Sequence, residues 1–338
     1  MPRIAFLNPN HEDYLGDSLF HGLRSLLGED VVELPKLDYA YDSYPPEAHR
    51  RLYGHGFTLY GLLPDITVDR NRLTDRIVDG EFDLVVFSAI WGTFGLFAQL
   101  APQIAGHTAI AVIDGSDRPE PYPYAGYWWR QRLWWTLPRA QGRAIYFKRE
   151  ITPWTGVFRA FLMLPPKLAE RLPSIEHMHE ISFSIPAEKI VAEAPVEKDR
   201  LIASHVVDPE VAQRIGASTS YAFDDEAAYY ADLQRSRFGI TTKRAGWDCL
   251  RHYEQAANGC VPCFRDLDRK PPRCAPHGLD ESNCVTYRNA DELLARLQRI
   301  DEPSYRSLQQ GALRWARANC TRRRAEEFLS VCGLGPVG

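Results

Sequence analysis

The sequence predicts an α/β protein in which two doubly wound domains face each other across a cleft. At 338 residues the chain is long for one hydrophobic core, and two domains of roughly 150 to 180 residues are the natural expectation. Buried-strand patterns alternate with amphipathic helices in both halves, which is typical of parallel sheets with crossover helices. Residues 185–196 form a linker between the two series. We therefore expect domains at residues 1–185 and 186–338.

The first αβ series begins at the N-terminus. Its predicted strands are apolar on both faces, as in DLVVF at residues 83–87, and a sheet covered by helices on two sides requires this. The expected elements are residues 3–8, 18–27, 31–34, 71–78, 82–89, 94–104 and 108–114. Ligands bind beyond the carboxyl ends of such strands. We expect the loops at residues 8–17, 91–93 and 114–117 to border the cleft.

Two insertions interrupt the first domain. The first, residues 36–64, is rich in Tyr, Pro and Gly, and the second, PYPYAGYWWRQRLWWTLP at residues 121–138, carries four Trp. Loops of this length are usually functional or ordered by a partner. The second insertion could line an acceptor pocket, contact a membrane surface or pack at an interface. Packing is favoured over membrane contact because interfacial helices normally carry a richer basic face.

The second series begins near residue 199 and ends with a long helical stretch. The expected elements are residues 201–207, 209–215, 219–223, 225–233, 237–240, a helix near 247–258, then 261–264, 284–287 and 291–300. The last stretch, residues 305–328, is long enough to pack back across both domains. Two doubly wound halves are the simplest architecture compatible with this order.

The loop TTKRAG at residues 241–246 follows a short strand and opens a helix. Free backbone N–H groups and the helix dipole favour an anion at such a position. Lys243 and Arg244 place two cations beside it. This combination is typical of a site for a phosphate group.

The helix itself has two distinct faces. At about 100° per residue one face, which we expect to be displayed, offers an indole, a planar cationic fork, a carboxylate and an amide: Trp247, Arg251, Glu254 and Asn258. The other face is apolar and should pack on the core: Cys249, Leu250, Tyr253, Ala256 and Ala257. Gly259 suits the left-handed position that ends a helix. The alternative is a solvated Arg251–Glu254 pair with Trp247 merely packing.

Composition narrows the class of protein. Apolar residues make up 45% and charged residues 25% of the chain, as in ordinary soluble globular proteins. A net charge of −4 gives no global basic field, which argues against nucleic acid as the partner. The N-terminus has no signal-peptide pattern and no run approaches 18 apolar residues, so we expect a cytoplasmic protein. Seven cysteines are an odd number and indicate reduced thiols.

Residues 236–294 resemble the donor-binding half of GT-B glycosyltransferases. In that family a loop supplies Arg and Lys to a nucleotide diphosphate, and a helix carries a carboxylate before a small-residue, glycine-ended stretch and a Pro-containing strand. EQAANGCVP at residues 254–262 is similar to that element. The resemblance implies two Rossmann-like domains and a nucleotide-sugar donor. It covers about 60 residues in motif detail, while the first half matches only in its αβ order.

The resemblance also implies roles for individual residues. Glu254 would hold sugar or ribose hydroxyls, and Lys243, Arg244 and Arg251 would meet the diphosphate. The rest of the implied donor site is Gly246, Trp247 and Asn258. In many retaining members a second glutamate precedes the one that Glu254 resembles, with seven residues between them. Gly246 stands at that position here, so the stereochemical outcome stays open.

A glycosyl transfer builds negative charge on the departing diphosphate, and a cationic loop at a helix N-terminus stabilises that charge without a metal. We therefore expect no metal and no cofactor besides the nucleotide-sugar co-substrate. An inverting reaction also needs a general base from the first domain. The candidates are Asp13, His11, Asp114 and Asp17. Asp13 and His11 come first because the first strand lies near the centre of such sheets, although all four are also common turn or cap residues.

Two alternatives remain open. One is a sugar-nucleotide epimerase or hydrolase of the same fold. The other is a non-catalytic interaction module that binds zinc through Cys260, Cys263, Cys274 and Cys284. A CxxC pair normally sits in a turn, whereas residues 260–264 read as a strand, so a transferase is favoured. The aromatic insertion suggests a lipid-linked or aromatic acceptor, and the oligomeric state is open.

Overall fold

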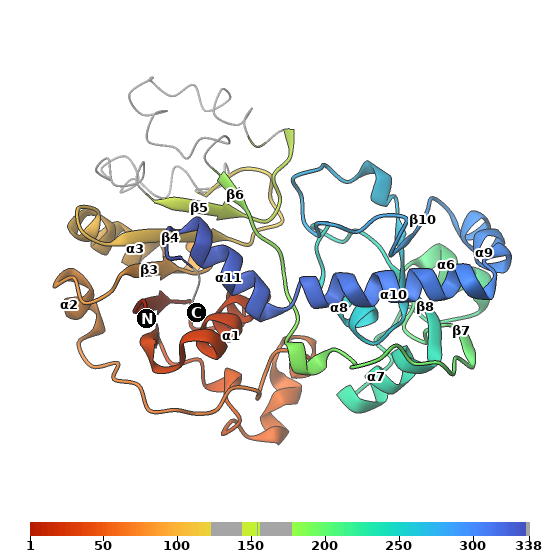
Figure 1. Ribbon diagram of the computed structural model, residues 1–338, viewed down its shortest axis with the longest axis horizontal. Helices are drawn as coiled ribbons and strands as arrows, with labels where there is room; N and C mark the ends of the chain where they lie inside the picture. The colour runs from red at the N-terminus through yellow and green to blue at the C-terminus, as the bar shows by residue number, and fades with distance from the viewer. Residues whose placement is uncertain (123–143, 154, 156–177, 336–338) are drawn as a thin grey trace.

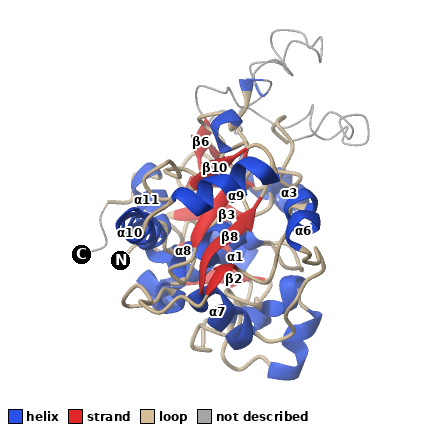
Figure 2. Ribbon diagram, turned by 90° about the vertical axis from the view of Figure 1, so that its right-hand side faces the viewer, coloured by secondary structure: helices blue, strands red, loops and turns tan. Residues whose placement is uncertain are grey.

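The computed structural model describes residues 1–122, 144–153, 155 and 178–335. These residues form two lobes, each built on its own sheet (Figure 1). We call the lobe around the first sheet the N-lobe and the lobe around the second the C-lobe. Helices cover both faces of the sheets (Figure 2), so the predicted α/β architecture of two doubly wound halves is confirmed.

In the described residues the N-lobe sheet has six parallel strands in the order β2-β1-β3-β4-β5-β6. The strands are β1 (Ile4–Leu7), β2 (Val31–Leu34), β3 (Leu84–Phe87), β4 (Ala109–Asp114), β5 (Ile145–Lys148) and β6 (Met178–Glu180). The connecting helices are α1 (Tyr14–Leu27), α2 (Leu73–Val78) and α3 (Ile90–Ile104). All residues of β1 and β3 are buried, as a sheet covered on two faces requires. The short strands β5 and β6 are not among the strands expected from the sequence.

The C-lobe sheet has four parallel strands in the described residues, in the order β10-β9-β8-β7. They are β7 (Arg200–Ile202), β8 (Ser236–Thr241), β9 (Val261–Arg265) and β10 (Val285–Tyr287). The helices of this lobe are α6 (Pro209–Ile215), α7 (Glu226–Arg235), α8 (Leu250–Ala257), α9 (Ala290–Arg299) and α10 (Glu302–Ala318).

One expected strand of the C-lobe is wrong. Residues 219–223 form no strand and are largely exposed. The ring of Tyr221 instead stacks on His55 of the N-lobe, with centroids 5.3 Å apart. The segment therefore contributes to the contact between the lobes and is not part of the sheet.

The last two helices cross from the C-lobe to the N-lobe (Figure 1). Helix α10 packs on α8, where the rings of Tyr253 and Trp315 lie 4.8 Å apart. Helix α11 (Thr321–Val331) packs on α1 and on the N-lobe sheet, where Phe147 and Phe328 lie 4.8 Å apart. The C-terminal helices thus pack on both lobes, as expected for residues 305–328.

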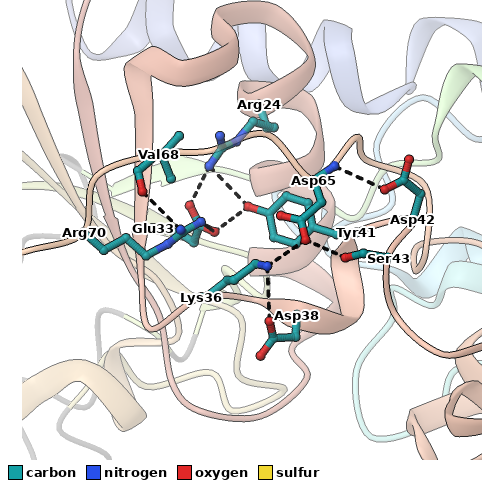
Figure 3. A network of polar contacts seen from close by, with 10 residues as sticks. All are labelled: Arg24, Glu33, Lys36, Asp38, Tyr41, Asp42, Ser43, Asp65, Val68 and Arg70. Carbon is teal, nitrogen blue, oxygen red and sulfur yellow. Dashed lines mark hydrogen bonds and ion pairs between the residues drawn. The ribbon is translucent and has the colours of Figure 1, made fainter.

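The first insertion is tied to the N-lobe by a network of ion pairs (Figure 3). Glu33 on β2 is fully buried and accepts hydrogen bonds from Arg24, at 2.5 Å, from Arg70 and from the hydroxyl of Tyr41 in the insertion. Lys36 Nζ lies 2.8 Å from Asp65 Oδ2, which joins the two ends of the insertion. A buried carboxylate with two guanidinium partners avoids the penalty of an unpaired charge. The insertion is therefore a fixed part of the lobe.

The second insertion lies outside the described residues from residue 123 onward. Within the described chain, no helix combines the length and the hydrophobicity that a membrane span needs.

The contact between α1 and α11 predicts opposite effects for two helical glycines. A Cβ on Gly22 would lie 2.7 Å from the Thr321 carbonyl carbon and 3.0 Å from Ala325 Cβ, whereas a Cβ on Gly95 in α3 would meet nothing within 4 Å. We expect Gly22→Ala to lower the free energy of unfolding by about 1–3 kcal/mol through overpacking. Gly95→Ala should raise it by up to about 1 kcal/mol through helix propensity. Urea denaturation measures both, and a stabilising Gly22→Ala would contradict the tight contact.

Candidate functional site

A cavity of about 890 Å³ lies between the lobes. We call it the interlobe cleft. Its N-lobe wall includes Glu12, Tyr14, Arg50, Arg51, Tyr53, Asp117, Arg149 and Phe183. Its C-lobe wall includes Tyr221, Tyr229, Arg244, Gly246, Asp248, Cys249, Arg251 and Glu254. The volume is near the upper end of the range of about 300–1,000 Å³ that is usual for ligand pockets.

The C-lobe wall depends on the loop between β8 and α8, which His252 anchors within the C-lobe through two hydrogen bonds. The His252 ring is fully buried; its Nε2 lies 3.0 Å from the Trp247 carbonyl oxygen, and its Nδ1 lies 2.9 Å from Thr241 Oγ1. Because a carbonyl oxygen only accepts, Nε2 carries the proton and Nδ1 accepts from the threonine. Burial lowers the pKa of His252 to about 3. The neutral ring therefore joins the start of the loop to its end.

Residues of the N-lobe also bind the same loop through hydrogen bonds. Arg149 Nη1 donates to the Asp248 carbonyl oxygen at 3.0 Å, and Glu150 Oε1 accepts from the Trp247 backbone N–H at 2.7 Å. The Asp248 side chain in turn accepts from the Phe183 backbone N–H at 2.8 Å. These residues follow β5 and β6, so the loop of one lobe is fixed by the strand ends of the other.

The same contact explains why residue 246 is a glycine. A Cβ on Gly246 would lie 2.6 Å from Glu150 Oε1 and would also clash with the Asp117 carboxylate. Two N-lobe carboxylates therefore occupy the space that a side chain at this position needs. A larger residue at this position would have to displace both carboxylates.

Two of the three predicted cations lie in the cleft. Arg244 and Arg251 line it, and neither has a carboxylate within 4.0 Å among the described residues. Arg251 Nη1 is buried without a hydrogen-bond partner. Lys243 does not line the cleft; it is exposed, with its ammonium 5.5 Å from the Trp247 ring centroid.

The predicted displayed face of α8 needs correction. The helix begins at Leu250, so Trp247 is not part of it. Glu254 is only 8% exposed and lines the cleft, whereas Asn258 is 1% exposed and hydrogen-bonds Gln234 at 2.9 Å. The alternative of a solvated Arg251–Glu254 pair is also wrong, since these side chains form no ion pair in the described structure.

Other predictions for α8 are confirmed. The side chains of Leu250, Tyr253, Ala256 and Ala257 are buried, and Gly259 has a φ of 63° just after the helix. Cys249 differs, because it precedes the helix and lines the cleft.

Glu254 accepts a hydrogen bond on each of its carboxylate oxygens. Its Oε1 accepts from Thr58 Oγ1 at 2.5 Å, and its Oε2 accepts from the Tyr229 hydroxyl at 2.9 Å. Burial raises the pKa of the Glu254 carboxyl, because a charged form is penalised away from water. Both oxygens retain further acceptor capacity. The carboxyl can therefore still accept a hydrogen bond from a hydroxyl of a ligand in the cleft.

None of the four candidate bases lines the cleft. Asp114 is fully buried and pairs with Lys148 Nζ at 3.1 Å, inside the sheet rather than in the cleft. Asp17 is buried in the first turn of α1 and accepts from the Tyr60 hydroxyl at 2.9 Å. His11 is exposed and stacks on Trp91 at 4.8 Å.

Asp13, the fourth candidate, is the N-cap of α1. Its Oδ2 accepts from the Gly16 backbone N–H at 3.0 Å, as N-cap residues do. Burial raises the pKa of its carboxyl. Its neighbours Glu12 and Tyr14 line the cleft, but Asp13 does not.

Glu12 is a cleft residue that sequence reasoning passed over. It lies on the loop after β1, and its carboxylate has no hydrogen-bond or ion-pair partner among the described residues. The position of this loop at a strand end is a sequence signal, but an irregular loop has no periodicity to show which of its side chains faces inward. Arg149 and Asp117 were missed for the same reason.

The cysteines do not assemble a metal centre in the described part of the chain, where no group of three or more His, Cys, Asp or Glu side chains could hold a metal ion. Cys260, Cys263, Cys274 and Cys284 are all buried and free. Val261 and Pro262 lie in β9, as expected for a strand rather than a zinc-binding turn.

Comparison with solved structures places this chain in a known fold. HepE of Anabaena, solved in complex with UDP, matches with a TM-score of 0.55 over 98% of this chain and 99% of its own, at 8% identity. Sucrose-phosphate synthase of Thermosynechococcus elongatus matches with a TM-score of 0.50 over 98% of both chains, at 12% identity. The chain thus has the GT-B fold, as predicted.

At the level of sequence, no protein-family profile matches this chain and no curated protein matches it significantly.

The buried His252 predicts a pH dependence of stability. Its pKa is about 3 in the folded protein against an ordinary value of 6.5, so below pH about 6.5 the unfolded chain binds a proton that the folded chain excludes. The free energy of unfolding should therefore fall as the pH drops from about 6.5 toward 3. We expect a shallower fall in His252→Gln, measured by urea denaturation at several pH values. Equal slopes would contradict a neutral buried ring, and His11→Gln provides an exposed control.

Proposed function

We propose that this protein is a metal-independent glycosyltransferase that moves a sugar from a nucleotide-diphosphate donor to a hydroxyl acceptor. The observation that carries the proposal is the pair Arg244 and Arg251, which line the interlobe cleft without a carboxylate partner beside the buried Glu254. HepE has been solved with UDP and also with UDP and glucose. That fold neighbour supports a nucleotide-sugar donor.

The C-lobe wall supplies the chemistry that the donor needs. Negative charge grows on the leaving diphosphate in the transition state, and preoriented cations at that point stabilise it. Guanidinium groups suit this role because they form paired hydrogen bonds to phosphate oxygens. We assign the diphosphate to Arg244 and Arg251, and donor hydroxyls to Glu254. We propose Lys243 as a third cation for the diphosphate. This role requires its exposed side chain to turn toward the bound donor.

The N-lobe wall supplies the acceptor side. We propose Glu12 as the general base, because it lines the cleft and its carboxylate is unpartnered within the described chain. Asp13 and His11 remain alternatives on the same loop, but the first caps α1 and the second stacks on Trp91. Tyr14 and Tyr53 also line this wall, which supports an acceptor that is partly apolar, such as a lipid-linked or aromatic compound.

The first test of the proposal is donor binding. We expect one of the UDP, GDP, ADP or dTDP sugars to bind the wild-type protein in calorimetry. Arg244→Gln and Arg251→Gln should each weaken that binding roughly tenfold or more, since hydrogen bonds to charged groups contribute about 1.5–3 kcal/mol. The exposed Arg214→Gln, which loses only a surface pair with Asp291, should bind normally. Folded protein that binds none of the donors would exclude the proposal.

The second test is turnover. Glu12→Gln keeps the size of the side chain but cannot take a proton, so the release of nucleoside diphosphate should slow by about 10²-fold or more while donor affinity changes little. Glu29→Gln, an exposed change at the other end of α1, is the matched control. If the donor is turned over at the full rate when no acceptor is present, the protein would instead be a hydrolase or an epimerase. Unchanged turnover in Glu12→Gln would return the role of base to Asp13 or His11.

A further inference from the structure

The tip of the first insertion reaches out of the N-lobe into the C-lobe through Thr58. This residue is 1% exposed, and both its side chain and its backbone contact the C-lobe. Its Oγ1 donates to Glu254 Oε1 at 2.5 Å, and its backbone N–H donates to Glu226 Oε1 at 2.5 Å. The Tyr230 hydroxyl lies 2.7 Å from the same Oγ1. Since the threonine proton is directed at Glu254, Tyr230 is the donor to Oγ1.

The backbone of Thr58 is held in a conformation that its side chain disfavours. Its φ is 75°, a value that is a genuine outlier for a β-branched residue and is normally left to glycine. Such strain persists only where the surroundings over-determine it, and it clusters at functional sites. Glycine would remove the strain here but would also remove the hydroxyl. The strain thus points to a use for the hydroxyl.

Thr58 also lies where several segments of the two lobes meet. Glu226, which binds its N–H, accepts from Lys189 Nζ at 2.7 Å through its second oxygen. Lys189 belongs to η8 (Ala187–Lys189), on the segment that links the lobes. The preceding residue in the insertion, Phe57, is buried against Tyr229 with ring centroids 6.3 Å apart. The insertion, the linker, α7 and α8 therefore form one continuous contact.

We propose that Thr58 is a positioning residue for the donor, acting through Glu254, and that it makes donor binding depend on contact between the lobes. This inference rests on the proposed function. A carboxylate has about four acceptor positions, of which Thr58 and Tyr229 occupy one on each oxygen. These two bonds fix the rotation of the carboxylate, so the remaining positions are presented to the cleft in one orientation. Preorganisation of this kind raises affinity because less freedom is lost on binding.

The test compares substitutions that separate the hydroxyl from the backbone strain. Thr58→Val removes the hydroxyl and keeps the strain, Thr58→Gly removes both, and Thr58→Ser keeps the hydroxyl. We expect Thr58→Val and Thr58→Gly to weaken binding of the donor found with the wild-type protein by roughly tenfold or more. Thr58→Ser should bind within about threefold of wild type. Thr108→Val is the matched control, because Thr108 is buried with an unpartnered hydroxyl in the N-lobe.

Thr58→Gly keeps the test decisive if Thr58→Val folds poorly, because glycine adopts a φ of 75° without strain. A purely structural role predicts normal donor affinity in Thr58→Gly at unchanged or higher thermal stability. A double-mutant cycle with Glu254→Gln gives a second readout. If Thr58 acts through Glu254, the double variant should lose no more donor affinity than whichever single variant binds the donor more weakly. Independent roles would instead give additive losses of binding free energy.

The outcomes separate this inference from the proposed function. A wild-type protein that binds none of the nucleotide sugars overturns both. Donor binding that is normal in Thr58→Val and Thr58→Gly overturns the inference alone. Tighter donor binding in either variant also overturns it, because the hydroxyl would then compete with the donor for Glu254 rather than orient it.

Discussion

The organisation of the cleft depends on the contact by which Arg149 and Glu150 of the N-lobe hold the backbone of Trp247 and Asp248 in the C-lobe. A loop between a strand and a helix has few internal hydrogen bonds, and its polar backbone must find partners elsewhere. Here those partners come from the other lobe. The contact also places two N-lobe carboxylates against Gly246, so both lobes contribute to the position of the loop.

The charges of the cleft show which of its groups are available to a ligand. Arg149 is 4% exposed and pairs with Asp117, because an isolated buried charge is costly. Arg244 and Arg251 are not paired within the described chain, and both reach the cleft. In a protein with a net charge of −4, unpaired cations gathered on one wall create a local field for an anion. Arg149 therefore contributes to the structure of the cleft, whereas Arg244 and Arg251 are available to an anionic ligand.

The sequence predicted what local pattern determines and missed what distant contacts determine. Periodicity identified most of the strands and the apolar face of α8. Loop and helix-cap chemistry located Arg244 and the glycine that ends α8, and the helical spacing placed Arg251 and Glu254 in the same segment. Thr58 lies 196 positions from Glu254, and Glu150 lies 97 positions from Trp247, so no local pattern joins them. Asp114 was misplaced because a strand-end carboxylate looks the same whether it faces the cleft or, as here, pairs with a lysine of the next strand.

The segment from Gly246 to Glu254 is held by the N-lobe at both of its ends. Glu150 binds its beginning and Thr58 binds its end, while His252 holds the middle to the C-lobe sheet. A displacement of one lobe relative to the other must therefore alter the two ends of this segment of the C-lobe wall together. A cleft built in this way belongs to neither lobe alone, because residues of the N-lobe fix the position of groups that the C-lobe presents to the cleft. Contact between the lobes is thus part of the geometry of the site.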